Sequence, residues 1–451
     1  MIYAGNRRIA VACRILQTPT RERVVGFRSV LVVGESGRIE AVLDQSDPAN
    51  EGAIQRALTE ADEVIELPET TYLLPGLVDL HVHAPQWPQV GTGLDLPLER
   101  WLFEYTFPLE ARYDNLEFAQ HVWTDLVSTL LAHGTTTAVY YGSVHVDSTT
   151  SLARTCATLG QRALVGRVAM DHPEGTPDWY RDESASVAVA SSQQSIEAIT
   201  AIGSRLVAPV ITPRFTPACT DATLAGLGEL AEATGVHVQT HCSESDWHHG
   251  YSIDRFGCSD TEALERFGLL RPHTVLAHSD HMSDGDARRA VEREAGVAHC
   301  PLSNAYFANA VFPARHFLEA GLRMGLGTDI AGGPRPGLLP QCGDAVAMSR
   351  LLEDGTDARL PLAERGRPDS RITTVDAFWM ATVGGAEVLG LPIGLIEPGR
   401  QFDAIAVDTK RGLGALRVRD DLDDDTRILE KIVNLASPSD ITHVWVDGRR
   451  V

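Results

Sequence analysis

Histidine and carboxylate side chains stand at the ends of several apolar runs in this chain. His81 and His83 close the run Leu-Val-Asp-Leu-His-Val-His and, being two residues apart, point to one face of a strand. His241, His278 and Asp329 each end another run. Neutral imidazoles and a carboxylate suit zinc and leave one coordination position for water. A lone histidine at a strand end is usually structural, but this set predicts a metal centre.

Glu244 follows His241 by three residues, in the segment His-Cys-Ser-Glu. At that distance its carboxylate reaches back over the metal centre without being a ligand. We therefore predict that Glu244 moves a proton between water and a ring nitrogen of the substrate. The alternative is an ordinary solvated loop glutamate, which the neighbouring histidine disfavours.

The elements that must position these groups alternate between strands and helices. Amphipathic stretches such as Leu116–Ala132, Leu224–Ala233 and Thr261–Phe267 lie between apolar runs. This rhythm favours an α/β fold, a parallel (β/α)8 barrel of the TIM type, in which strand ends gather at one mouth. An open doubly wound sheet is less favoured, because no G-x-G-x-x-G or P-loop motif follows the first strand. The predicted strands are Leu77–His83, Thr135–Tyr141, Ala163–Met170, Leu206–Thr212, His237–His241, Thr274–His278, Val297–Cys300 and Met324–Asp329.

Both ends of the chain are rich in short alternating runs. Ser29–Val33 and Arg38–Leu43 predict strands near the start, and Ala404–Val407 and Thr442–Val446 predict strands near the end. We expect both termini to build one small β-sandwich, with two unrelated decorations as the alternative. The predicted boundaries are 1–73 and 395–451 for the sandwich and 74–394 for the metal-dependent barrel.

Composition limits the classes of partner. The chain has 451 residues and a formal net charge of −22, so nucleic acid and anionic membrane surfaces are disfavoured as partners. A small neutral molecule stays open as the substrate. Seven scattered cysteines without a C-x-x-C pair predict reduced thiols, and no apolar run is long enough for a membrane span. We therefore expect a cytoplasmic protein.

Longer motifs surround the candidate residues. They are Pro75–Gln86 (Pro-Gly-Leu-Val-Asp-Leu-His-Val-His-Ala-Pro-Gln), Gly93–Leu98, Trp101–Pro108 (Trp-Leu-Phe-Glu-Tyr-Thr-Phe-Pro), His133–Thr137, Gly160–Asp171, Thr212–Phe215, Ala298–Pro301 and Gly325–Asp329 (Gly-Leu-Gly-Thr-Asp). This series resembles the amidohydrolase superfamily, and within it the guanine deaminases, through most of residues 70–400. His-x-His and Gly-Thr-Asp are shared across the superfamily, whereas Ala-Pro-Gln and Tyr-Thr-Phe-Pro are far more specific.

The resemblance implies roles for individual residues. Glu244 matches the proton shuttle, and His278, together with Asp329, matches the groups that hold the hydrolytic water. Gln86 and Arg214 match positions that hold a purine, and a Gln amide and an Arg fork supply the fixed donors that a polar base requires. Residues that match the zinc ligands are His81, His83, His241 and Asp329. Beside the purine-holding pair, Trp87 and Phe215 stack on the base or line its pocket, with ordinary core packing as the alternative.

The resemblance further implies an activity and a cofactor. The expected enzyme is a homodimeric hydrolase of purine catabolism, acting on C–N bonds in cyclic amidines, that converts guanine to xanthine and ammonia. Related binuclear centres bridge two metals through a carboxylated lysine, but both lysines here, Lys410 and Lys431, follow the predicted barrel. One zinc ion is therefore expected, with iron(II) open as the alternative.

Other functions stay open at the level of sequence. The loops 245–258, 304–313 and 334–337 depart from the guanine deaminase pattern, so a pterin such as isoxanthopterin, 8-oxoguanine or an aminopurine analogue is the alternative substrate. Hydrolysis of a ring amide or a C–Cl bond is a further option. A non-catalytic barrel scaffold is disfavoured, since the inferred ligands and Glu244 are present. His248 and His249 are interpreted as solvated loop residues, with a second metal or a substrate contact as the alternative.

Overall fold

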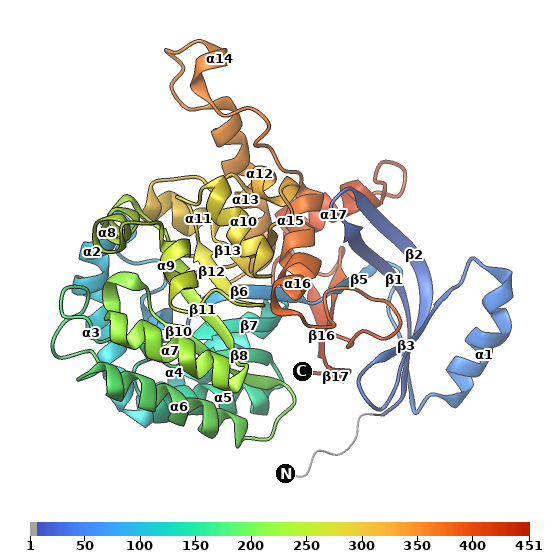
Figure 1. Ribbon diagram of the computed structural model, residues 1–451. Coiled ribbons are helices and arrows are strands. Elements are labelled where there is room, and N and C mark those ends of the chain that lie inside the picture. Colours follow the sequence, from blue (N-terminus) through green and yellow to red (C-terminus); the bar gives the residue numbers. More distant parts are fainter. Residues whose placement is uncertain (1–6) are drawn as a thin grey trace.

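The computed structural model describes residues 7–451, which form two sheets and a layer of surrounding helices (Figure 1). The larger sheet has the order β14-β13-β12-β11-β10-β8-β7-β6, and every neighbouring pair is parallel. The short strand β9 pairs with β10. The strands are β6 (Leu77–His83), β7 (Thr135–Tyr141), β8 (Arg162–Gly166), β9 (Val168–Ala169), β10 (Val207–Pro213), β11 (His237–Cys242), β12 (Val275–His278), β13 (Gly296–His299) and β14 (Arg323–Leu326).

The first and last strands of this sheet meet and close it into a barrel. The Asp329 amide donates to the His81 carbonyl at 2.9 Å, and the His83 amide donates to the Ile330 carbonyl at 2.8 Å. The predicted (β/α)8 barrel is therefore confirmed. The last strand ends earlier than predicted, at Leu326, because the buried Asp79 carboxylate accepts hydrogen bonds from the Thr328 amide at 3.0 Å and its hydroxyl at 2.6 Å. In the following segment the Gly327 amide still donates to the His299 carbonyl of β13 at 2.9 Å, and Asp329 and Ile330 then bond to β6.

Helices cover the outside of the barrel, as Figure 1 shows. In α4, for example, the Asn115 side chain accepts from the Glu117 and Phe118 amides and caps the first turn, and the face with Trp123 and Leu126 is buried. The helices from the barrel onward are α2 (Leu98–Trp101), α3 (Phe107–Glu110), α4 (Leu116–Ala132), α5 (Val146–Leu159), α6 (Ala185–Thr200), α7 (Asp221–Thr234), α8 (Asp246–Phe256), α9 (Asp260–Arg266), α10 (Asp284–Glu292), α11 (Pro301–Ser303), α12 (Ala314–Glu319), α13 (Leu338–Asp354), α14 (Leu362–Arg365), α15 (Thr374–Trp379), α16 (Gly385–Leu389) and α17 (Asp425–Leu435).

The smaller sheet has eight strands drawn from both ends of the chain. Strand β15 pairs with β5 from the N-terminal part and with β16 from the C-terminal part, so the predicted domain built from both termini is confirmed. Its strands bond into a single sheet, which α1 (Glu51–Glu60) packs against. The strands are β1 (Ile9–Thr20), β2 (Arg23–Val33), β3 (Ile39–Asp44), β4 (Glu63–Glu66), β5 (Thr71–Pro75), β15 (Ala404–Asp408), β16 (Ile441–Val446) and β17 (Arg449–Arg450). The chain division at 73/74 and 394/395 stays a prediction.

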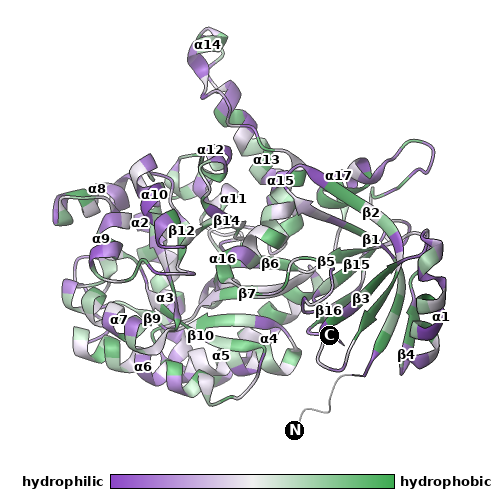
Figure 2. Cartoon of the chain, turned by 45° about the vertical axis from the view of Figure 1, so that its right-hand side comes forward, coloured by the Kyte–Doolittle hydropathy of each residue, from purple (hydrophilic) through white to green (hydrophobic). Residues whose placement is uncertain are grey.

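Hydropathy follows these layers. The strands of both sheets are largely hydrophobic, while the outer helices alternate between hydrophilic and hydrophobic residues (Figure 2). Within residues 7–451, every helix is too short or too polar to span a membrane.

At the junction of the two sheets, the buried Arg162 guanidinium donates two hydrogen bonds to the Asp403 carboxylate, at 2.9 and 3.0 Å. This ion pair ties the barrel to the terminal sheet.

Candidate active site

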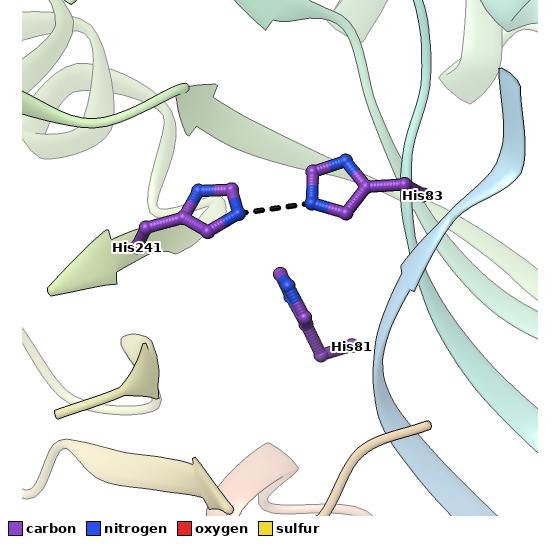
Figure 3. A group of neighbouring side chains, drawn as sticks. All are labelled: His81, His83 and His241. Carbon is purple, nitrogen blue, oxygen red and sulfur yellow. Dashed lines mark hydrogen bonds between the residues drawn. The ribbon is translucent and has the colours of Figure 1, made fainter. Parts of the chain in front are cut away.

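Four buried histidines meet at the carboxyl ends of the barrel strands. His81 and His83 lie at the end of β6, His241 near the end of β11, and His278 at the end of β12. The Nε2 atoms of His83 and His241 are 2.9 Å apart, and the ring of His81 lies edge-on to both, with centroids 4.9 Å away (Figure 3). Parallel strand ends share one edge of a barrel, so residues far apart in the chain are brought together there.

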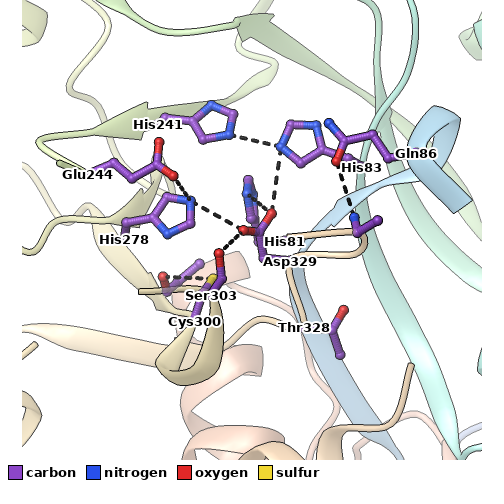
Figure 4. Close-up of polar contacts among 12 residues, drawn as sticks. His81, His83, Gln86, His241, Glu244, His278, Cys300, Ser303, Thr328 and Asp329 are labelled. Carbon is purple, nitrogen blue, oxygen red and sulfur yellow. Dashed lines mark hydrogen bonds and ion pairs between the residues drawn. The ribbon is translucent and has the colours of Figure 1, made fainter. Parts of the chain in front are cut away.

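Asp329 completes this cluster from the segment after β14 (Figure 4). Its Oδ1 lies 3.0 Å from His81 Nε2, and its Oδ2 lies 3.8 Å from His278 Nε2. The Ser303 hydroxyl donates to Oδ2 at 2.5 Å and fixes the carboxylate. The structure thus unites all five residues that the sequence marked at strand ends.

The donor set fits a metal ion. Three overlapping groups have ligand atoms within 4.8 Å of one another, drawn from the cluster of His81, His83, His241, His278, Asp329 and Glu244. Neither ring nitrogen of His81 makes a hydrogen bond, nor does His278 Nε2. Buried polar atoms without partners cost free energy, so inward-facing donors of this kind favour binding of a cation.

The protonation states agree with metal binding. Burial, and then the repulsion that a protonated ring would meet from a second protonated ring beside it, hold the pKa of His81, His83 and His241 well below the usual range. Neutral imidazole is the form that ligates metals. The His241 Nδ1–H donates to the Arg214 carbonyl at 2.7 Å, which leaves its Nε2 lone pair directed into the cluster.

Glu244 lies above the cluster, in the loop after β11. The side chain is buried, and its Oε1 is 3.7 Å from His278 Nε2 (Figure 4). Burial, and then the nearby Asp329 carboxylate, raise the pKa of Glu244 to about 8. A carboxyl group with such a pKa carries a proton near neutral pH and gives it up readily, which is what a general acid requires.

His248 is not the solvated loop residue that sequence reasoning favoured. It lies in α8 with a fully buried side chain, and its Nε2–H donates to Asp260 at 2.9 Å. Its Nδ1 accepts from the Glu244 amide at 3.4 Å, and Asp260 also accepts from the Ser243 amide at 2.9 Å. The pair therefore supports the backbone that carries Glu244. His249 instead stacks on His281, with ring centroids 5.0 Å apart.

A pocket opens over the cluster, with about 390 Å³ of empty space including its mouth. His83, His241, Glu244 and Asp329 line one part, and Gln86, Arg214 and Phe215 line another. Its apolar walls also contain Leu98, Trp101, Leu102 and Phe307.

Trp87 does not belong to the lining of this pocket. Its indole N–H donates to Asp125 at 2.6 Å, so the ring packs toward α4. Trp101 and Phe307, which sequence reasoning did not single out, supply aromatic surface at the pocket instead. Trp101 lies inside one of the specific motifs, but its position there carried no signal that separated a pocket residue from a core residue.

Glu110 is a further residue that sequence reasoning missed. It ends α3, is fully buried, and accepts hydrogen bonds from Arg214 at 2.6 and 3.0 Å and from the Gln86 amide nitrogen at 3.0 Å. An acidic residue at the end of a short helix is usually solvated. Its place two residues after the Tyr-Thr-Phe-Pro motif was the only available hint.

The barrel, its mouth of imidazoles and carboxylates, and the buried acid Glu244 define a metal-dependent hydrolase class. Residues 72–451 match the model of the Amidohydrolase family. The chain belongs to this family.

Relatives with a high share of aligned residues include guanine deaminases. The guanine deaminase of Dictyostelium discoideum is 33% identical over 404 residues, covering 87% of this chain and 85% of that protein. The guanine deaminase of Homo sapiens is 32% identical over 442 residues, covering 94% and 91%. A guanine deaminase structure from C. acetobutylicum with bound guanine superposes with a TM-score of 0.87 at 28% identity, covering 98% of this chain and 100% of that one.

Proposed function

We propose that the protein hydrolyses guanine to xanthine and ammonia. The observation that carries this proposal is one pocket that holds both the buried Glu244, above an imidazole–carboxylate cluster, and a polar wall of Gln86 and Arg214. The resemblance to guanine deaminases across most of the chain supports guanine as the base.

The proposed cofactor is one zinc ion, held by His81, His83, His241 and Asp329. When bound, zinc supplies a Lewis acid that lowers the pKa of water to near 7. Only two lysines occur, and both lie beyond the barrel strands, so no lysine bridges a second ion at the mouth. Metal analysis of the purified protein distinguishes zinc from iron(II).

The chain's own residues account for the proton movements. Water adds at C2 of guanine while Glu244 gives its proton to N3, and His278 orients the water from its place between Glu244 and Asp329. One water proton then passes through Glu244 to the amino group, the C2–N bond breaks as ammonia leaves, and the proton of the C2 hydroxyl returns to Glu244 as the carbonyl of xanthine forms. The atoms balance as guanine plus water giving xanthine plus ammonia.

The pocket walls position the base. Gln86 and Arg214 hold its polar edge, and Phe215 covers a ring face from beside His241, with centroids 6.1 Å apart. The buried apolar walls exclude bulk water, which strengthens each electrostatic contact with the substrate. A homodimer, as the resemblance implies, and a cytoplasmic location, as the scattered cysteines indicate, are part of the same proposal, and light scattering tests the oligomeric state.

Ammonia release from a panel of bases tests the proposal. The zinc-loaded protein is incubated with guanine, 8-oxoguanine, isoxanthopterin, adenine, cytosine and an s-triazine. We expect guanine to be turned over fastest, with xanthine as product. Faster turnover of another base would move the substrate to the alternative class of amino-heterocycles. No ammonia from any base, with metal bound, would overturn the deaminase assignment.

A further inference from the structure

The buried carboxylate of Glu110 lies directly behind the two polar residues of the pocket wall. Its oxygens accept three hydrogen bonds, two from Arg214 and one from the Gln86 amide nitrogen. The Glu110 side chain is about 1% exposed and does not line the pocket itself. Any effect of Glu110 on a bound molecule must therefore pass through Gln86 or Arg214.

Glu110 fixes the orientation of the Gln86 side-chain amide, that is, the positions of its oxygen and nitrogen. Figure 4 shows Gln86 beside the cluster. The nitrogen donates to Glu110 at 3.0 Å, while the oxygen accepts from the Ala331 amide at 3.2 Å. A reversed amide would place its oxygen against a carboxylate and its NH₂ against an N–H, and both buried bonds would be lost. The group that Gln86 has free to donate to a ligand is consequently its second N–H.

Arg214 offers donors for a different reason. A guanidinium has five N–H groups and no acceptor, and Glu110 uses only part of them. Burial acts to lower the pKa of Arg214, but the Glu110 carboxylate outweighs it, so the pKa lies above its usual range. The Phe107 ring covers one face of the guanidinium, with its carbon 4.9 Å from the ring centroid. The polar wall therefore presents N–H groups to the pocket.

The shape of a purine relates this wall to one edge of the base. In the six-membered ring C2 stands opposite C5, so a base whose C2 meets Glu244 directs its O6 and N7 edge away from that residue. In a 6-oxo purine both atoms on this edge are acceptors, whereas a 6-amino purine places a donor beside N7. A wall of N–H donors matches a 6-oxo purine. A 6-amino purine would place its own N–H groups against those of the wall.

We propose that Glu110 is a positioning residue that holds Gln86 and Arg214 as hydrogen-bond donors, so that the pocket selects purines with an acceptor at position 6 over those with an amino group there. This inference rests on the proposed deamination at C2. The competing explanation is that Glu110 forms a buried ion pair of structural value only, like Asp403 with Arg162.

The test compares guanine with 2,6-diaminopurine, which has the same 2-amino group but an amino group at position 6. We would measure kcat and KM for both, with product analysis to identify the carbon that loses its amine, in the parent protein, Glu110→Gln and Asp403→Asn. Asp403→Asn is the matched control, because it also changes a buried carboxylate paired with arginine but lies outside the pocket.

We expect Glu110→Gln to lower the guanine preference in kcat/KM by about tenfold or more, mainly through a higher KM for guanine, since one paired contact to a base edge discriminates on that order. Asp403→Asn should leave the preference unchanged. Glu110→Asp keeps the charge and should restore part of the preference. A Glu110→Gln enzyme whose preference stays within about twofold of the parent would overturn the inference while leaving the proposed function intact.

A second measurement needs neither turnover nor a folded variant. Calorimetry of the zinc-loaded parent protein compares binding of hypoxanthine, which has O6 but no 2-amino group, with binding of adenine. We expect hypoxanthine to bind about tenfold more tightly. Equal or tighter binding of adenine would overturn the inference even in an enzyme that deaminates guanine. Failure of the proposed function would appear separately, as absence of ammonia from guanine.

Discussion

Buried polar groups gather at both ends of the barrel, but their hydrogen bonding differs. At the base, Arg162 at the start of β8 makes two hydrogen bonds to Asp403 of the terminal sheet. At the mouth, both ring nitrogens of His81 and Nε2 of His278 lack hydrogen bonds, and two imidazole nitrogens face each other. At the base, the charged groups are paired within the protein. At the mouth, imidazole nitrogens remain without a hydrogen bond.

The contrast separates groups that hold the fold from groups that wait for a ligand. A buried polar atom without a partner costs free energy, so it persists where binding or chemistry recovers that cost. Variants at the mouth should therefore change metal content or rate, and variants at the base should change stability. Each of the following predictions tests one side of this division.

The largest effect should come from removing an imidazole of the cluster. In His83→Ala we expect the metal content to fall from about one ion per chain toward zero, and ammonia release to fall to background, because a catalytic site of this kind needs all its protein ligands. Metal analysis and an activity assay check this. A variant with full metal content and parental rate would remove His83 from the site.

Glu244→Gln should separate metal binding from proton transfer. The amide keeps the shape of the side chain but cannot act as an acid or base near neutral pH, so kcat should fall by about 10²–10⁴-fold while metal content stays parental. The control is the metal analysis on the same sample. If the metal-replete variant turned over at nearly the parental rate, Glu244 would not be the proton shuttle.

Asp403→Asn should show the opposite behaviour. The substitution removes the carboxylate that is hydrogen-bonded to the buried Arg162 and leaves Asp447 at 3.9 Å as its counter-ion, so we expect the free energy of unfolding to fall by about 3 kcal/mol. Metal content and kcat should remain within about twofold of the parent, since the pair lies outside the pocket. Chemical denaturation and steady-state kinetics at 25 °C measure the two quantities. A large loss of kcat with parental stability would contradict the division.

Asp260 lies near the mouth, but both of its carboxylate oxygens accept hydrogen bonds. A variant at this position tests whether hydrogen bonding or location in the barrel decides if a residue contributes to stability. Burial acts to raise its pKa, but His248 and the surrounding hydrogen bonds outweigh this, and the pKa lies below its usual range. A lowered folded-state pKa adds stability above the unfolded value, near 3.9, which is lost as pH falls through the folded value.

In Asp260→Asn we therefore expect a loss of about 2 kcal/mol in the free energy of unfolding at pH 7. The difference from the parent should shrink as the pH falls below about 4. Denaturation of the metal-free proteins at pH 7, 5 and 3.5 measures it. A difference that grew on acidification would mean that the sign of the pKa shift is wrong.

Periodicity predicted the fold well because both sheets bury apolar strands. The strands Leu77–His83 and Thr135–Tyr141 and the helix Leu116–Ala132 have the predicted bounds. The residues at strand ends were also found, since a polar group that ends an apolar run is conspicuous and a parallel barrel brings such ends together. The last strand was predicted too long, because the segment after Leu326 bonds to Asp79, which lies 249 residues before Thr328 in the chain.

Contacts between loops were beyond prediction. His248 was interpreted as a solvated residue and Glu110 was not singled out, and only the three-dimensional structure shows that they pair with Asp260 and Arg214 in the interior. Trp87 stands next to Gln86 in the chain, yet its indole bonds to Asp125 rather than entering the pocket. Neighbours in sequence share a pocket only when the local turn directs both side chains the same way, and that turn depends on long-range packing.

The joint between β6 and the segment after β14 determines when, during folding, the proposed metal site can form. His81 and His83 come from one side of this joint and Asp329 from the other, and the two sides bond through Asp329 to His81 and His83 to Ile330. During synthesis the two histidines leave the ribosome long before the aspartate. Asp79 and Thr328, which bond at the same joint, are 249 residues apart in the chain. The proposed ligand set is therefore complete only after the ring of strands has closed, so tight binding of an ion would report a finished barrel.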